Sequence, residues 1–303
     1  MRLFINGTNR VTHIWKTDTI MMFSTGTIFL AASTIALLLC VVDNAVSGKK
    51  GVCAYAPYIL CDDFRVLNNI SWWYGWRDAY RLYDQHVTQK CPSPHAQMPE
   101  FVPMVWSIHS NESSRWIHIP PGSQFVLGYN EPDHVPQAHM TPQEAAMYWP
   151  MIEKAAVGIS LVAPAPASHG FHWLDQFFHL CNSCRIDYVA AHSYLCNADQ
   201  TMAYLKAMYS RYHKKVWLTE FACAHTPDDH VQLGLMRTLL PKLEAAEFVY
   251  RYSWFNGRIK SDDPTKFVRQ SASLLHSNAS TLTMIGQFYN AFQPESLGSS
   301  LVG

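Results

Sequence analysis

Two glutamates stand where strongly apolar stretches of the chain end. Glu131 follows Gly128-Tyr129-Asn130, and Glu220 follows Leu218-Thr219. A carboxylate at the end of a buried strand loses hydration unless it gains a partner. A single such glutamate is most often a capped or ion-paired surface residue, but two in equivalent positions favour a catalytic pair. Glycoside hydrolysis needs such a pair, with one carboxylic acid to protonate the leaving oxygen and one carboxylate to attack the anomeric carbon.

Other apolar stretches also end in polar or aromatic side chains. One ends in His192-Ser193-Tyr194 and another in Arg251-Tyr252-Ser253-Trp254-Phe255, while two earlier ones end in Trp72–Trp76 and Pro103–Trp106. Such residues are unfavourable in a purely apolar core, but they suit a cleft that binds sugar. Each tryptophan can equally be a packing residue, because aromatic side chains commonly fill cores.

These side chains require strands to position them, and eight apolar runs can be counted. They are apolar throughout, as expected of parallel strands that are buried on both faces. Helical segments separate several of them, over 145–157, 199–212 and 230–245, and Thr141, Pro142 and Glu144 form a capping box before the first. The sequence therefore predicts an α/β protein, a single (β/α)8 TIM barrel with its site at the carboxyl ends of the strands. The runs are Gly51–Pro57, Ile70–Trp76, Phe101–Trp106, Gln124–Asn130, Ile159–Pro164, Ile186–Tyr194, Lys215–Ala222 and Val249–Asn256.

The composition narrows the classes of ligand. The 303 residues carry 23 basic and 23 acidic side chains, and this zero net charge lacks the basic excess of a nucleic-acid binder. Hydrophobic residues make up 49%, which excludes wholesale disorder. Only 15% of residues are charged and 13% are aromatic, a balance that suits a neutral, hydroxyl-bearing ligand.

The amino-terminal segment predicts export. Ile20–Val42 carries no charge, follows a basic stretch and precedes the small residues Ala45-Val46-Ser47. We therefore expect residues 1–47 to be a signal peptide, with an uncleaved signal anchor as the alternative, since 23 uncharged residues also span a bilayer. Residues 48–292 are expected to form one catalytic domain and 293–303 a polar tail. The protein would be secreted, or membrane-anchored with the catalytic domain outside.

Glycosylation signals and cysteines agree with export. Sequons begin at Asn69, Asn111 and Asn278. Cys196 and Cys223 follow the sixth and seventh runs, which would be neighbours in a barrel, so we predict that they form a disulfide with a Cα separation below about 7 Å. No pairing can be assigned for the remaining cysteines. The Cys181–Cys184 CxxC lacks a second pair and the histidines form no metal motif, so no metal or cofactor is predicted.

The order of five sequence blocks resembles glycoside hydrolase family 128, whose relatives include fungal alkali-sensitive-linkage proteins. The resemblance spans Gly51 to Phe292. It implies a barrel with catalytic glutamates on strands four and seven. The blocks are Ser71-Trp72-Trp73-Tyr74-Gly75-Trp76, Phe101-Val102-Pro103-Met104-Val105-Trp106, Leu127-Gly128-Tyr129-Asn130-Glu131-Pro132-Asp133, Trp217-Leu218-Thr219-Glu220-Phe221-Ala222 and Arg251-Tyr252-Ser253-Trp254-Phe255.

The resemblance also implies roles for individual residues. Glu131 would be the general acid/base and Glu220 the nucleophile, while Asn130 would bond the sugar 2-hydroxyl. His192 and Tyr194 could orient Glu220 by hydrogen bonding, although His192 is equally compatible with a satisfied core histidine.

Aromatic contacts with the sugar are implied as well. Trp254 would form the floor of the subsite that holds the cleaved sugar, and three further indoles are stacking candidates: Trp73, Trp76 and Trp106. The chain departs from the family at Ser193, where an aromatic residue is usual, and at Leu195, where glycine is usual.

Two functions from different classes follow. The first is a secreted, retaining, endo-type β-1,3-glucan hydrolase that acts as a monomer on a polysaccharide or oligosaccharide without a cofactor. The second is a glucan-binding recognition protein that uses the same cleft without turnover. The presence of both glutamates favours the hydrolase.

Overall fold

The computed structural model describes residues 48–78, 98–109 and 117–294. The predicted export segment, Cys91, Asn111 and residues 295–303 lie outside these ranges. Eight strands occur in the described part of the chain, and all overlap the predicted runs. They are β1 (Lys50–Cys53), β2 (Trp72–Tyr74), β3 (Glu100–Phe101), β4 (Phe125–Leu127), β5 (Ser160–Val162), β6 (Val189–Ser193), β7 (Val216–Phe221) and β8 (Val249–Trp254).

All strand pairs are parallel. Six strands form one sheet in the order β3-β2-β1-β8-β7-β6, and β4 pairs with β5. Two isolated parallel bridges connect these sheets, Met104 with Leu127 and Val162 with Tyr188. The predicted α/β class with a parallel sheet is therefore confirmed. The third strand is shorter than the predicted Phe101–Trp106, because Pro103 has no N–H to continue the ladder.

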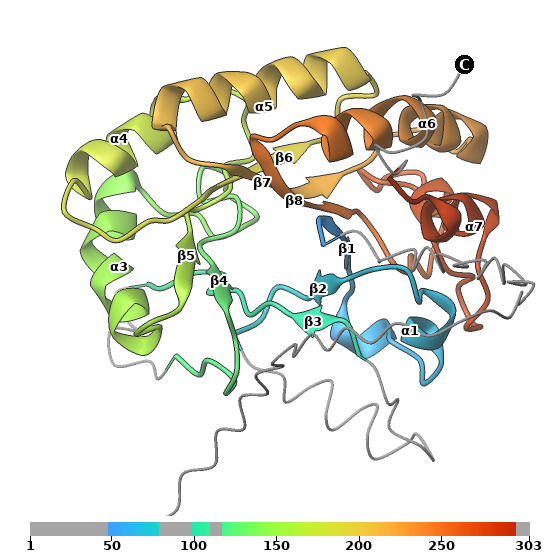
Figure 1. Ribbon diagram of the computed structural model, residues 1–303, viewed down its shortest axis with the longest axis horizontal. Helices are drawn as coiled ribbons and strands as arrows, with labels where there is room; N and C mark the ends of the chain where they lie inside the picture. The colour runs from blue at the N-terminus through green and yellow to red at the C-terminus, as the bar shows by residue number, and fades with distance from the viewer. Residues whose placement is uncertain (1–47, 79–97, 110–116, 295–303) are drawn as a thin grey trace, which may run out of the picture. The chain divides into compact units, whose positions relative to one another are not determined.

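Helices lie along the outside of the strands (Figure 1). They are α1 (Asp63–Val66), α3 (Pro142–Ala155), α4 (His172–Leu180), α5 (Ala198–Tyr212), α6 (Asp229–Ala245) and α7 (Met284–Ala291). The predicted capping box of α3 is present, since Thr141 accepts from the Glu144 N–H while the Glu144 carboxylate accepts from the Thr141 N–H. Within the described ranges, no helix has the length and apolarity needed to cross a bilayer.

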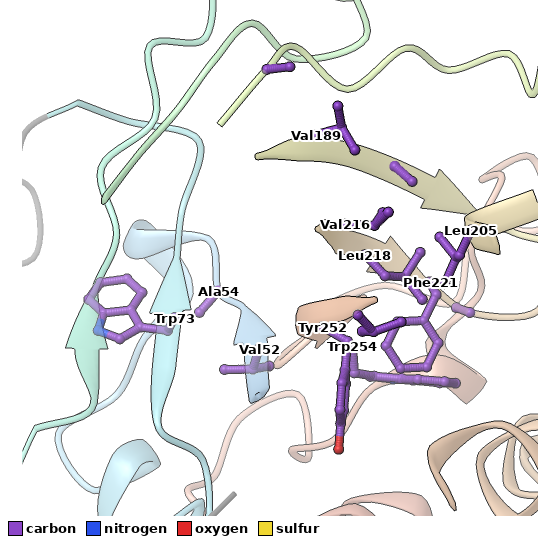
Figure 2. Packing of buried hydrophobic residues seen from close by; sticks show 14 of the residues in the cluster. Val52, Ala54, Trp73, Val189, Leu205, Val216, Leu218, Phe221, Tyr252 and Trp254 are labelled. Atoms are coloured by element: carbon purple, nitrogen blue, oxygen red, sulfur yellow. The ribbon is translucent and has the colours of Figure 1, made fainter. Parts of the chain in front are cut away.

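Side chains of the strands divide between two apolar clusters and alternate between them, except at register shifts in β7 and β8. One cluster, here called the helix-facing cluster, joins strand residues to helix residues; Leu218 and Phe221 of β7 lie with Leu205 of α5 in this cluster (Figure 2). The other, here called the inner cluster, joins strands that are not neighbours. In it the Trp217 ring of β7 lies 5.0 Å from the Trp72 ring of β2 and 5.1 Å from the Phe125 ring of β4. This period of two decides which residues can reach a site between the strands.

Two disulfides have both cysteines within the described ranges. The predicted bond between Cys196 and Cys223 is confirmed, with a Cα separation of 4.6 Å, and it links the chain after β6 to the chain after β7. Cys181 and Cys184 form a second bond across three residues of sequence. Cys53 is a free thiol and is fully buried.

Candidate active site

A cavity of about 610 Å³ opens at the carboxyl ends of the strands. Its polar lining includes Asn130, Glu131 and Glu220, which follow or belong to β4 and β7. Its aromatic lining comes from several separate segments. The aromatic residues are Tyr55, Tyr58, Trp76, Trp106, Tyr194, Phe255 and Phe267. The cavity therefore combines flat apolar surfaces with a few convergent polar groups, as small-molecule sites do.

The two predicted glutamates face each other in this cavity. One carboxylate oxygen of Glu131, one of Glu220 and a ring nitrogen of His192 all lie within 4.8 Å of one another. Glu131 has a positive φ of 44°, a left-handed conformation that is uncommon outside glycine. This turn follows Asn130 directly and lets two consecutive side chains line the same cavity. Backbone strain of this kind is concentrated at functional sites.

Glu220 reaches the cavity because β7 contains a bulge. Leu218 pairs with Tyr252 and Phe221 with Trp254, so β7 carries two residues where β8 carries one. In a regular strand, Glu220 would share the helix-facing side with Leu218, two residues away. The extra residue reverses the alternation, so Phe221 takes the helix-facing side and Glu220 turns inward. Bulges commonly re-aim a side chain in this way beside active sites.

Three donors hold the carboxylate of Glu220. Tyr74 OH donates to Oε1 at 3.1 Å, Trp76 Nε1 donates to Oε1 at 2.9 Å, and Tyr194 OH donates to Oε2. Burial and the negative charge of Glu220 raise the pKa of both phenols well above its ordinary value, so both remain donors. These hydrogen bonds fix the orientation of the Glu220 carboxylate.

A glycine makes this arrangement possible. Gly75 stands between two of the donors, and a Cβ there would lie 2.6 Å from the carbonyl oxygen of Ala54. The chain after β2 can therefore approach β1 closely only with glycine at this position. Trp76 then adopts a positive φ of 58°, which turns its indole to Glu220.

Glu131 is linked to a buried histidine. Nδ1 of His192 lies 2.9 Å from Oε1 of Glu131, and Nε2 of the same ring lies 3.5 Å from Oε1 of Glu220. Burial raises the pKa of Glu131, but the hydrogen bond and charge of His192, aided by His134, outweigh it and lower this pKa overall. Burial likewise lowers the pKa of His192, and the charges of Glu220 and Glu131 outweigh it and raise that pKa.

The same three residues have the donor types of a metal site. However, the 2.9 Å separation between His192 and Glu131 is that of a direct hydrogen bond, and two phenols and an indole already donate to Glu220. The geometry is therefore that of an imidazole between two carboxylates, hydrogen-bonded to Glu131 and 3.5 Å from Glu220.

Most predicted site residues meet at the cavity. Trp76, Trp106 and Tyr194 line it together with the two glutamates. Asn130 donates through Nδ2 to Gln137 at 3.4 Å, whereas its buried Oδ1 has no hydrogen-bond partner among the described residues. An added hydroxyl group can satisfy that oxygen. Tyr194 donates to Glu220, whereas Nε2 of His192 lies 3.5 Å from Glu220 without a hydrogen bond and the His192 ring bonds Glu131 instead.

Two predicted sugar contacts are wrong. The structure places Trp73 and Trp254 in the helix-facing cluster with 1% and 0% of their surfaces exposed, so neither can stack on a sugar (Figure 2). The Trp73 ring packs against Phe101, and Nε1 of Trp254 donates to the Ala272 carbonyl. The cause is the alternation of side chains along β2 and β8.

Sequence reasoning missed the residues that take those places. Tyr74 is one residue after Trp73 and donates to Glu220, and Phe255 is one residue after Trp254 and lines the cavity. The period of two could have identified both, had the face of each strand been assigned. By contrast, Tyr58 and Phe267 line the cavity from outside every predicted run, and Tyr55 lies in the run Gly51–Pro57 but beyond the end of β1.

Comparison with known proteins agrees with this site. A family model described as the glycosyl hydrolase catalytic core matches residues 54–289. Alkali-sensitive linkage protein 1 of Schizosaccharomyces pombe is 29% identical over 226 residues, which cover 70% of this chain and 39% of that protein. The chain thus corresponds to well under half the length of this relative.

Solved structures are also similar. A family 128, subgroup II endo-β-1,3-glucanase from Sorangium cellulosum is 32% identical with a TM-score of 0.67, and the match covers 82% of this chain and 100% of that one. A family 128, subgroup I endo-β-1,3-glucanase from Amycolatopsis mediterranei, solved in complex with laminaritriose, is 26% identical with a TM-score of 0.61 over 80% of this chain and 98% of that one.

Proposed function

The chain belongs to the glycosyl hydrolase catalytic core family and, within it, to glycoside hydrolase family 128, and from this premise we propose that it hydrolyses β-1,3-glucan in endo fashion with retention of configuration. The substrate class is supported by the solved relatives named above. It is also supported by the aromatic side chains that line the cavity around the two carboxylates.

The observation that carries the proposal is the separation of the two carboxylates. Oxygens of Glu131 and Glu220 lie within 4.8 Å of each other. Retaining enzymes keep their carboxyl groups about 5–5.5 Å apart, whereas inverting enzymes need about 6.5–9.5 Å to admit a water molecule. The spacing therefore supports direct attack by a carboxylate on the anomeric carbon.

The surroundings of the two carboxylates support different roles. Three donors hold the Glu220 carboxylate in position to attack the anomeric carbon and form a covalent glucosyl ester. Glu131 has a closely coupled imidazole that can share a proton with it, which suits a group that first gives a proton to the leaving oxygen and then takes one from water. Esterification removes the negative charge of Glu220, so His192 is then left with one carboxylate partner.

Asn130 and the aromatic walls would place the sugar. The unpartnered Oδ1 of Asn130 can accept from the 2-hydroxyl, and Trp76 and Trp106 offer ring faces or edges at the cavity. Two further aromatic pairs, Tyr55 with Tyr58 and Tyr194 with Phe267, also line it. Several separate aromatic surfaces suit a chain that occupies more than one subsite, which supports endo action.

We also propose that the eight strands close into a (β/α)8 barrel and that the protein is a secreted monomer. The two bridges between the sheets and the pairing of β1 with β8 support closure. Disulfides, which persist in oxidising compartments, and the exposed sequon residue Asn278 support export.

Laminarin hydrolysis tests the function. The wild-type protein should release new reducing ends as a ladder of oligosaccharides, with the β-anomer appearing first by NMR. Glu220→Gln should lower kcat by about 10⁴-fold or more while the fold and laminarin binding persist. Glu144→Gln, at the exposed cap of α3, is the matched control and should retain activity. Binding without any product would instead favour the glucan-binding protein. Glucose as the sole product would contradict endo action. An initial α-anomer would contradict retention.

A further inference from the structure

Three side chains behind Glu220 converge on one backbone oxygen. The Thr219 carbonyl accepts from Cys53 Sγ at 3.2 Å, from Tyr74 OH at 3.2 Å and from Ser253 Oγ. These residues come from β1, β2 and β8, and all three are fully buried. Thr219 is the extra residue of the bulge and has no register partner in either β6 or β8. Side chains therefore hold a carbonyl that precedes the proposed nucleophile directly.

The number of donor protons available decides which acceptor the Tyr74 hydroxyl bonds. Tyr74 has one hydroxyl proton and two acceptors within reach, the Thr219 carbonyl at 3.2 Å and Glu220 Oε1 at 3.1 Å. A carbonyl oxygen has two lone pairs. Cys53 Sγ lies closer to this carbonyl, at 3.2 Å, than to Tyr74 OH at 3.6 Å or Ser253 Oγ at 3.7 Å, so its proton goes to the carbonyl. Donors from Cys53 and Ser253 then fill both lone pairs, and the proton of Tyr74 is left for Glu220. Burial raises the pKa of the Cys53 thiol well above its ordinary value, which keeps its proton in place.

We propose, on the basis of the function proposed above, that Cys53 and Ser253 are positioning residues for Glu220. By donating to the Thr219 carbonyl they hold the bulge that turns Glu220 inward, and they direct the Tyr74 hydroxyl to the Glu220 carboxylate. Neither residue lines the cavity, so their effect on the reaction passes through Thr219 and Tyr74.

Substitution of Cys53 tests this role, because alanine and serine are both smaller than cysteine but only serine keeps a donor. With Cys53→Ala, the Tyr74 hydroxyl turns to the vacant lone pair and Glu220 loses a donor. A hydrogen bond to a charged group is worth about 1.5–3 kcal/mol, so kcat on laminarin should fall roughly tenfold or more. The KM should change little. Cys53→Ser should restore most of the lost kcat. Ser253→Ala should behave like Cys53→Ala.

A double variant separates positioning from packing. If Cys53 acts through Tyr74, adding Cys53→Ala to Tyr74→Phe should lower kcat no further, whereas independent packing effects would add. Ser193→Ala is the control, since Ser193 is also a buried strand serine but its hydroxyl lies 2.8 Å from Thr201 Oγ1 and away from Glu220. It should keep the wild-type kcat.

The outcomes are distinct. Wild-type kinetics in Cys53→Ala would overturn the inference, as would equal losses in Cys53→Ala and Cys53→Ser or an additive double variant. In all these cases an active wild type and an inactive Glu220→Gln would leave the proposed function intact. A wild type without hydrolytic activity, or an active Glu220→Gln, would overturn both.

Discussion

The disulfide between Cys196 and Cys223 should contribute more to stability than the one between Cys181 and Cys184. The first closes a loop across 27 residues and the second across three. A crosslink stabilises mainly by restricting the unfolded chain, and this effect grows with the logarithm of the loop length. Replacing both cysteines of one bond with alanine removes each crosslink separately.

The magnitude follows from the two loop lengths. The chain-entropy relation gives about 3.5 kcal/mol for the long loop and about 1.6 kcal/mol for the short one at 25 °C. Native geometry near Cys223 should survive the change, because Gln232 donates to its carbonyl at 2.8 Å and accepts from its N–H at 2.8 Å. The difference of about 2 kcal/mol should therefore come largely from the unfolded state.

Thermal unfolding measures this difference. The Cys196→Ala/Cys223→Ala protein should melt about 4–8 °C below the Cys181→Ala/Cys184→Ala protein, which serves as its control for loss of a sulfur pair. At 25 °C the long-loop variant should keep a kcat close to that of the wild type, because Tyr74, Trp76 and Tyr194 still hold Glu220. Equal melting temperatures, or a lower one for the short-loop variant, would refute the reasoning.

Further predictions concern the cavity. His192→Gln removes the main charge that lowers the pKa of Glu131 and leaves only His134 to oppose burial, so this pKa should rise. Because a general acid must be protonated, the alkaline limb of the kcat/KM profile should move to higher pH, and a shift to lower pH would contradict the coupling. Trp106→Ala should raise KM for laminarin by about tenfold through loss of stacking. Trp73→Ala should lower the melting temperature by more than Trp106→Ala does, and it should leave the KM of the folded protein unchanged. The reverse pattern would reject the assignment of these two tryptophans.

Much of the site could be predicted because its residues are unusual for their positions. Glu131 and Glu220 interrupt apolar runs, and polar groups at successive strand ends must meet when the strands are parallel. The disulfide followed from the same reasoning, since Cys196 and Cys223 come after neighbouring strands. The capping box before α3 is a local signal that tertiary contacts do not override.

The face of each strand could not be predicted. Strands that are buried on both sides are apolar at every position, so they lack the alternation that would separate inner from helix-facing residues. Trp73 and Trp254 are therefore indistinguishable by sequence from the residues beside them. Only the packed structure shows that Tyr74 donates to Glu220 and that Phe255 lines the cavity.

Strand alternation alone would also have misplaced the catalytic pair. Counting from Trp217, which belongs to the inner cluster, a regular β7 would direct Glu220 to the helices. Counting likewise from Tyr129, which belongs to the helix-facing cluster, a regular chain would place Asn130 inward but Glu131 outward. The bulge at Thr219 and the left-handed turn at Glu131 correct both positions. The residues that perform the chemistry thus depend on two local departures from regular backbone, so substitutions that restore a regular strand should remove activity even with both glutamates present.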